Sequence, residues 1–296
     1  MEWSRAKNIL IMAFLCLNLI LGYRLWHVIA AYPVGTAQIP LEEVINTQQY
    51  LAEVGIKITP SIPREVASLP LLNVQVAPFN NQQVAEFFLG TVEDVEIIWA
   101  PESPGKVVFV RNGEELSIYP DGIVSYQYTG FYIGADSIKK TNYSQEANRW
   151  AQAYVTGQGE WGQELIIKEI RPLPGDGRYV IRLEQVYEEI PLVGSAGVEV
   201  VWNKGQIEFF WQRMLEPLGP VGEAKTVIPA TEALHNLAAG LQELPAGDFI
   251  VIDEITLGYY NKLYDARQWE AVPVWAFKTD AGHWYYINAF TGEAEQ

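Results

Sequence analysis

The chain has 296 residues, a length that suits one large or two medium-sized domains with real hydrophobic cores. Hydrophobic residues make up 49% of it and charged residues 19%, which is a globular composition and excludes a mainly disordered chain. The formal net charge is −16, so the basic surface with which nucleic-acid-binding proteins neutralise phosphates is not expected. Cys16 is the only cysteine, which excludes disulfides within the chain and a cysteine-based zinc site.

The first predicted element is an apolar helix over residues 9–31. Its 23 residues would extend about 35 Å, enough to cross a hydrocarbon layer of about 30 Å. By the positive-inside rule, the basic residues before the run place residues 1–8 in the cytoplasm and the bulk of the chain outside it. The side chains expected at the two membrane interfaces are Trp3, Arg5, Lys7, Tyr23, Arg24 and Trp26.

A cleaved signal peptide is the main alternative for this segment, because it also has a basic start and an apolar stretch. No small-x-small cleavage site follows the apolar run closely, since the chain continues Gly-Tyr-Arg-Leu-Trp-His from Gly22. A lipoprotein leader is excluded because Phe14 and Leu15, rather than small residues, precede Cys16. The pattern therefore favours a retained, single-pass membrane anchor.

A linker with two prolines is predicted over residues 32–40, followed by a first extracytoplasmic α+β domain over residues 41–140. Helical spacing of apolar residues predicts a helix from Leu41 that stops at Gly55, and a second, short helix that ends at Gly90. The pairs Asn112-Gly113 and Asp121-Gly122 predict hairpin turns between strands.

The second half, residues 141–296, contains an imperfect internal repeat over about 143–220 and 226–296. Each copy has a helix with a candidate polar cap, Ser144 or Thr231, and then an apolar strand, "LIIKEI" or "FIVIDEI". Each closes with a strand-turn unit in which Gly205 corresponds to Gly292. The predicted fold class is therefore α+β: an N-terminal transmembrane helix, then tandem modules of a helix packed on an antiparallel sheet. The strands after Gly105 resemble a more diverged third copy of the strand half.

Residues that carry chemistry are few and scattered. The three histidines, His27, His235 and His283, have no second ligand at metal-binding spacing, so no metal or other cofactor is expected. "VGSAG" from Val193 lacks the spacing of a nucleophile elbow and is better explained as a tight turn. Paired carboxylates, as in "EQVYEEI", are expected to be solvated, and Trp275 is expected to be structural. No catalytic, cofactor-binding or metal-binding residue is predicted.

The opening "MEWSRAKNILIMAFLCLNLILGY" resembles the start of the YycI proteins of Gram-positive bacteria. The resemblance continues through "VAEFFLG", and "VPVWAF" (Val272–Phe277) and "INAFTGE" (Ile287–Glu293) also resemble PepSY-like modules. It implies a non-enzymatic cell-membrane protein that acts with a YycH-like partner on the essential WalK (YycG) sensor histidine kinase, in control of cell-wall metabolism. The PepSY-like modules alone imply an alternative, an extracytoplasmic inhibitor or chaperone of a protease or wall hydrolase. No small-molecule substrate is implied.

Two residues of the predicted anchor are candidates for contact with a partner's transmembrane helix, because the resemblance implies regulation through such helices. Asn18 is polar, and a polar side chain in a bilayer is stabilised by a hydrogen bond to a neighbouring helix. Gly22 would let a neighbouring backbone approach closely. The alternative for Asn18 is that it merely tolerates a position near the bilayer edge.

Overall fold

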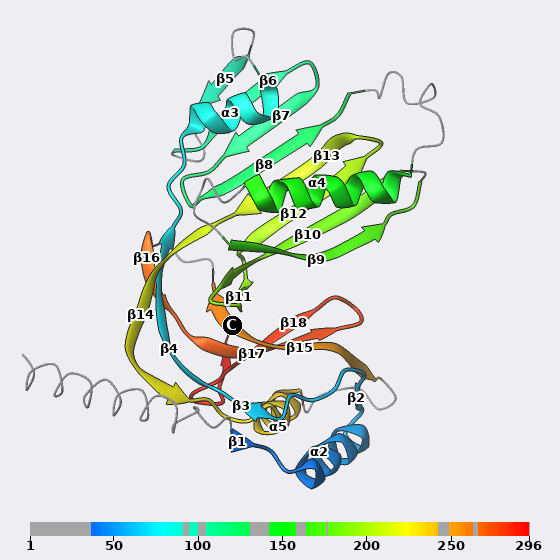
Figure 1. Cartoon of the computed structure of the whole chain (residues 1–296), viewed down its shortest axis with the longest axis vertical. Helices are drawn as coiled ribbons and strands as arrows, with labels where there is room; N and C mark the ends of the chain where they lie inside the picture. Colours follow the sequence, from blue (N-terminus) through cyan, green and yellow to red (C-terminus); the bar gives the residue numbers. More distant parts are fainter. Residues whose placement is uncertain are drawn as a thin grey trace, which may run out of the picture.

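The computed structural model describes residues 37–90, 95–99, 105–130, 142–157, 164–175, 177–241, 249–262 and 266–295. These residues form two lobes joined by an arch of long strands (Figure 1). The upper lobe is formed from residues 77–214, and the lower lobe from residues 37–66 and 227–295. The lower lobe is therefore built from two segments that lie far apart in the sequence.

The upper lobe is built on an antiparallel sheet, one face of which is covered by helices α3 (Asn81–Leu89) and α4 (Tyr143–Gly157) (Figure 1). In spatial order its strands are β5 (Glu96–Trp99), β6 (Val107–Arg111), β7 (Glu114–Ile118), β8 (Ile123–Tyr128), β13 (Gln206–Arg213), β12 (Gly197–Asn203), β10 (Arg178–Tyr187) and β9 (Glu164–Pro172).

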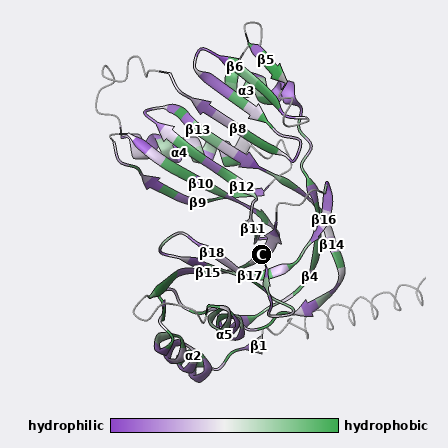
Figure 2. Cartoon of the chain, turned by 180° about the vertical axis from the view of Figure 1, so that it is seen from behind, coloured by the Kyte–Doolittle hydropathy of each residue, from purple (hydrophilic) through white to green (hydrophobic). Residues whose placement is uncertain are grey.

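Alternation of side chains explains why this sheet has one covered and one open face. In β12, Val198, Val200 and Trp202 are buried in the core beneath the helices. Between them, Glu199 and Val201 point to the opposite face and are only half-buried. Figure 2 shows the same alternation of polar and apolar residues along the neighbouring strands. The open face is therefore available to line a groove.

The lower lobe has a smaller sheet, with helices α2 (Leu41–Glu53) and α5 (Ala230–Gly240) packed side by side beneath it (Figure 1). Thr231 Oγ1 of α5 donates a hydrogen bond of 2.7 Å to Glu43 Oε1 of α2. The strands of the sheet are β19 (Ala294–Glu295), β18 (Trp284–Asn288), β17 (Pro273–Thr279), β15 (Ile250–Asn261) and β2 (Ile56–Ile58). Two further short strands, β1 (Ala37–Gln38) and β3 (Glu65–Val66), pair with each other.

Among the described residues, strand pairing joins the lobes at two places. The arch contains β4 (Ser68–Val76), β14 (Leu215–Thr226) and β16 (Gln268–Ala271), with β4 in the middle. Strand β11 (Ile190–Gly194) belongs to both sheets, because it pairs antiparallel with β10 of the upper lobe and parallel with β15 of the lower lobe. Leu72, Leu192, Leu215 and Tyr259 form a small core at this junction.

The described residues confirm a mixed α+β fold dominated by sheet, with helices packed on it. A helix followed by a meander of four strands occurs at α4-β9-β10-β12-β13 and again at α5-β15-β17-β18-β19. The same order occurs at α3-β5-β6-β7-β8, where the sequence resembles a third copy. The lower sheet is not purely antiparallel, since β15 pairs in parallel with β2 and β11.

The predicted helix ends and turns agree with the structure, but the two predicted caps do not. Asn112 and Gly113 have left-handed backbone angles in the β6–β7 turn, and Gly90 ends α3 with a φ of 69°. Thr231 is not a helix cap: Pro229 precedes α5, and the threonine hydroxyl is used by Glu43 of the neighbouring helix. In the upper lobe, Ser144 is not a cap either: it lies inside α4, which Asn142 caps through its side-chain and backbone oxygens.

The predicted transmembrane helix, residues 9–31, lies outside the described residues. Among the helices that the structure describes, none is long and apolar enough to span a bilayer. The predicted domain boundaries near residues 40, 140 and 226 divide the chain along its sequence, and they stay predictions. In space, α2 and α5 come from opposite sides of the boundary near 140 and share the lower lobe.

Candidate functional site

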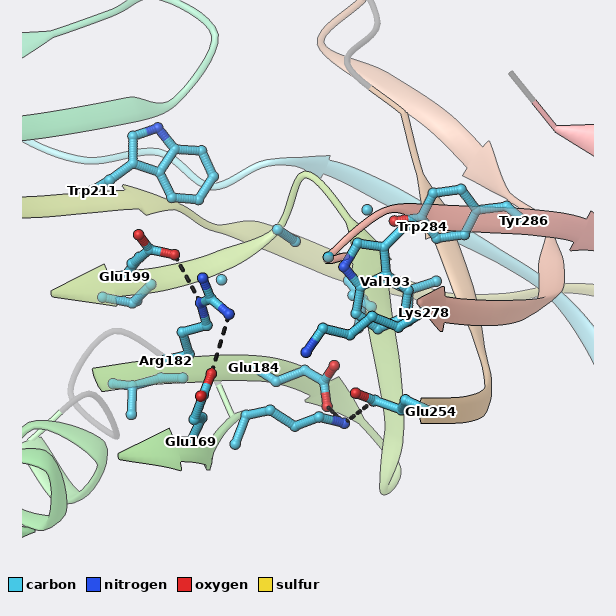
Figure 3. A pocket seen from close by; sticks show the side chains of 18 of the residues that line it. Glu169, Arg182, Glu184, Val193, Glu199, Trp211, Glu254, Lys278, Trp284 and Tyr286 are labelled. Atoms are coloured by element: carbon cyan, nitrogen blue, oxygen red, sulfur yellow. Dashed lines mark hydrogen bonds and ion pairs between the residues drawn. The ribbon is translucent and has the colours of Figure 1, made fainter. Parts of the chain in front are cut away.

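A groove of about 460 Å³ lies where the open face of the upper sheet meets the lower lobe. Its upper wall comes from β9, β10, β12 and β13, and its lower wall from β15, β17 and β18 (Figure 3). The β11–β12 turn closes the end at which the two sheets join. Because both lobes contribute side chains, the shape of the groove depends on how the lobes are held together.

A row of charged side chains crosses three strands of the upper wall. Arg182 of β10 pairs directly with Glu169 of β9 and Glu199 of β12 in the sheet register. Its guanidinium lies 3.1 Å from Glu169 and 2.9 Å from Glu199 (Figure 3). Burial disfavours the charge of Arg182, but its bonds to Glu199 and Glu169 outweigh this effect and raise its pKa. The row therefore places one positive charge between two carboxylates.

A second ion cluster connects the two lobes. Lys168 Nζ of β9 lies 3.4 Å from Glu184 of the same sheet and 2.5 Å from Glu254 of β15, in the lower lobe (Figure 3). Burial disfavours the Lys168 charge, but the hydrogen bond with Glu254 and the attraction of both carboxylates leave its pKa raised. For Glu184, burial raises the pKa, and the attraction of Lys168 offsets this only in part.

Aromatic rings line the groove on both sides. Trp211 is on the upper wall, and Trp284 and Tyr286 of β18 are on the lower wall, with their rings nearly parallel and 6.2 Å apart (Figure 3). Lys278 Nζ lies 5.8 Å from the centre of the Trp284 ring, within the range of a cation–π interaction. Burial, together with the neighbouring Tyr260, raises the pKa of Tyr286 to about 12, so this hydroxyl stays protonated at neutral pH.

The turn at the closed end of the groove is held by a buried polar network. Ser195 Oγ donates to the Asn261 carbonyl at 3.0 Å and accepts from Arg213 Nη1 at 2.6 Å. Gly194 and Gly197, on either side, have positive φ, and a Cβ on either would meet a backbone oxygen. The "VGSAG" segment is thus the predicted tight turn. Ser195 has the bonding of a structural hydroxyl rather than that of a nucleophile next to a base.

The arrangement is suited to binding. Lys168 and Arg182 each contact two carboxylates, so neither is poised to stabilise a developing negative charge. The exposed Trp284 and the half-buried Trp211 and Tyr286, beside paired charges, instead offer contact area and hydrogen bonds to an extended segment of another protein.

The eight residues predicted from the sequence are not among those that the structure describes. Asn18 and Gly22, like the predicted interface residues Trp3, Arg5, Lys7, Tyr23, Arg24 and Trp26, lie outside the described residues.

The histidines that are described lie elsewhere in the lower lobe. His235 is on α5, with its Nε2 3.3 Å from Thr47 Oγ1, and His283 is in the β17–β18 turn, where its backbone bonds Thr279. Across the described ranges, no group of three or more His, Cys, Asp or Glu side chains is arranged to hold a metal ion.

Sequence reasoning missed the groove residues, although a signal was present. The repeat aligns "LIIKEI" with "FIVIDEI", and these strands are β9 and β15, which face each other across the groove. Their charged positions Lys168 and Glu254 form the contact between the lobes. Charge inside an otherwise apolar strand is unusual, but only the pairing of the two lobes reveals the partner of each residue.

The fold and the groove together define a two-lobed α+β protein built from helix-plus-meander units, with a groove lined by aromatic and charged side chains between its lobes. Comparison with family models gives a match to the YycI protein family over residues 135–290, more than half of the chain. The chain belongs to the YycI family. Its members are membrane-associated regulators linked to the WalK/YycG two-component system, and the family is not known for enzymatic activity.

Comparison with solved structures supports the fold alone. The chain is similar to an uncharacterized protein from Eubacterium rectale ATCC 33656, with a TM-score of 0.53 and 12% sequence identity, over 82% of this chain and 91% of that one. No curated protein matches the sequence.

Proposed function

We propose that this protein is a non-enzymatic, membrane-anchored regulator of a WalK/YycG-type sensor histidine kinase. It acts together with a YycH-like protein, through its predicted anchor helix and through extracytoplasmic contacts, in control of cell-wall metabolism. The observation that carries the proposal is the match to the YycI family over residues 135–290.

The groove supports regulation by protein contacts. Regulation of this kind needs surfaces that bind, and the aromatic rings and paired charges between the lobes supply such a surface. Binding there would also bias the relative position of the lobes, because Lys168 and Glu254 join the two walls. A change in the position of the lower lobe would then reach the predicted anchor, which precedes this lobe in the chain.

The anchor supplies the second contact in the proposal. Asn18 would hydrogen-bond a polar group on the kinase's transmembrane helix, and Gly22, one turn later, would allow the two helices to pack closely. A single interhelical hydrogen bond in a bilayer contributes about 0.6–1.7 kcal/mol, or roughly a 3- to 18-fold change in affinity.

The test is an Asn18→Leu substitution in the full chain, in membranes that also contain the kinase and the YycH-like protein. Co-purification of the kinase is expected to fall roughly 3- to 18-fold, together with a change in kinase autophosphorylation. Ile20→Leu is the matched control, because it changes the same helix without altering its polarity. The proposal fails if Asn18→Leu keeps full regulation and co-purification while deletion of residues 41–296 also has no effect.

The alternative role, inhibition or folding assistance of a protease or wall hydrolase, predicts a different partner. Affinity purification of the full chain from solubilised membranes separates the two. A hydrolase recovered in place of the kinase and the YycH-like protein would favour the alternative.

A further inference from the structure

Helix α2 exposes an unusual apolar stripe. Leu41 and Ile45 are 57% and 45% exposed, and with the exposed Ala52 they lie within about 40° of one another around the helix axis. The exposed Gln48 is the polar residue on the same side, between Ile45 and Ala52. The buried face of the same helix, Val44, Thr47 and Leu51, points elsewhere, toward α5 and the lower-lobe core. The stripe is therefore not part of the core that holds the helix in place.

Acidic residues border the stripe. Glu42 and Glu53 lie within about 20° of each other on the side of the helix away from the core. Helix α2 contains three glutamates and neither lysine nor arginine. An occupant of the stripe must therefore match apolar side chains in its centre and negative charge along one border.

The length of chain before the lower lobe places this stripe close to a membrane. The predicted anchor ends at residue 31, and the described structure starts at Ala37, on the lower lobe beside α2 (Figure 1). Six residues span at most about 20 Å, so α2 is held near the bilayer surface, and the upper lobe lies at the opposite end of the molecule from α2 (Figure 1). If the transmembrane helix of a partner packs against this anchor, the membrane-proximal segment of that partner lies at the same distance from the bilayer as α2.

We propose that the stripe Leu41-Ile45-Ala52 binds an amphipathic, lysine- or arginine-bearing helix in the membrane-proximal extracytoplasmic part of the kinase. This inference rests on the proposed function, which supplies the anchor and the kinase. The bilayer itself is a poorer occupant, because Glu42 and Glu53 are repelled by anionic headgroups. A second copy of this chain is a poorer occupant as well, because it brings glutamates against glutamates.

The test introduces the photo-crosslinking amino acid p-benzoylphenylalanine at position 45 of the full chain, in membranes that contain the kinase and the YycH-like protein. Position 218, on the exposed Leu218 of the arch, is the matched control. We expect crosslinks from position 45, but not from 218, to a basic helix of the kinase next to its transmembrane segment.

Substitution provides a second measurement. Leu41→Gln with Ile45→Gln is expected to weaken co-purification of the kinase at least tenfold. Ile166→Gln with Leu218→Gln, at sites of similar exposure elsewhere, is expected to have no effect. An unchanged melting temperature shows that the first variant folds, and the crosslinking result stands even if that variant does not.

The outcomes separate this inference from the proposed function. Crosslinks from position 45 to lipid, to a second copy, to the YycH-like protein or to any other protein overturn the inference. So does the absence of a crosslink from position 45 when a crosslinker at Leu19 of the anchor still captures the kinase. If neither position captures the kinase and kinase activity is insensitive to deletion of the chain, the proposed function itself fails.

Discussion

Tyr154 on α4 makes a buried hydrogen bond that fastens the helix to the upper sheet. Its hydroxyl lies 2.5 Å from Gln212 Oε1 of β13, and burial raises the pKa of the phenol well above its usual value, so the hydroxyl remains a donor at neutral pH. Tyr154→Phe leaves the Gln212 oxygen without this donor, at a cost of about 1–3 kcal/mol. Thermal unfolding of the full chain in detergent should show the loss as a lower melting temperature.

Two further variants test that interpretation. Tyr50→Phe removes a hydroxyl from a ring that is exposed on α2, and is expected to leave the melting temperature unchanged. Gln212→Leu combined with Tyr154→Phe should recover part of the loss, because both ends of the bond then become apolar. Equal effects of Tyr154→Phe and Tyr50→Phe would contradict the assigned role of the hydrogen bond.

Single residues were predictable where their role is local. Trp275 is a structural residue, as predicted: its side chain is 1% exposed and its indole N–H donates to the Ile228 carbonyl at 2.9 Å. Thr231 was misjudged because serine and threonine near a helix start usually cap it. Here the hydroxyl bonds a glutamate 188 residues earlier in the chain, and no local pattern encodes that partner.

The contribution of the contact between β9, β10 and β15 to the stability of the fold is expected to depend on pH. Burial raises the pKa of Glu184 above 4.5, so the folded state favours its protonated form. Its contribution to stability is therefore present below the unfolded pKa and is lost as pH rises through the folded pKa. Glu184→Gln stays neutral, so the melting temperature of the variant relative to wild type should rise between pH 4 and about pH 7.

Thermal unfolding of the wild type and of Glu184→Gln, measured over that pH range, checks whether the difference in melting temperature rises with pH. Lys168 stays charged throughout, since its own pKa is raised, so titration of the lysine does not contribute to the slope. Glu164→Gln, at the exposed start of β9, is the control for the loss of a carboxylate from the same sheet. A difference for Glu184→Gln that is flat or falls with pH would show that attraction to Lys168, rather than burial, controls this carboxyl.

Helix ends and hairpin turns were the elements that the sequence pattern predicted well. Asn112-Gly113 and the Gly90 stop depend on backbone angles within a few residues, and such preferences are visible in any window of sequence. The groove was not predictable, because it requires β9 to lie opposite β15. That placement depends on β11 pairing with two sheets at once, and short apolar strands carry almost no information about their partners.

For the molecule as a whole, the junction between β11 and β15 determines whether the two lobes behave as one unit. A Cβ on Gly258 of β15 would lie 2.6 Å from the Pro191 carbonyl of β11, so Gly258→Ala must push the two strands apart. We expect a loss of about 1–3 kcal/mol and unfolding in two calorimetric steps, one for each lobe, in place of a single step.

The matched control for this junction is Gly240→Ala, since nothing lies within 4 Å of a Cβ at the end of α5. Alanine there should leave the unfolding profile unchanged or raise its midpoint slightly. A single transition in the Gly258→Ala variant, at the wild-type temperature, would show that the junction between β11 and β15 is not what couples the lobes.

The path of the chain through the two lobes also has a consequence for the order of folding during synthesis. Residues 77–214 form the upper lobe as one uninterrupted stretch, whereas the lower lobe needs α2 from the start of the chain and α5 with β15–β19 from its end. The upper lobe can close while the ribosome is still translating, but Val44 and Leu51 of α2 have no core to enter until the last 70 or so residues have emerged. The part of the protein that is made first is thus completed last, and its apolar surface stays uncovered for most of the time that the chain takes to be made.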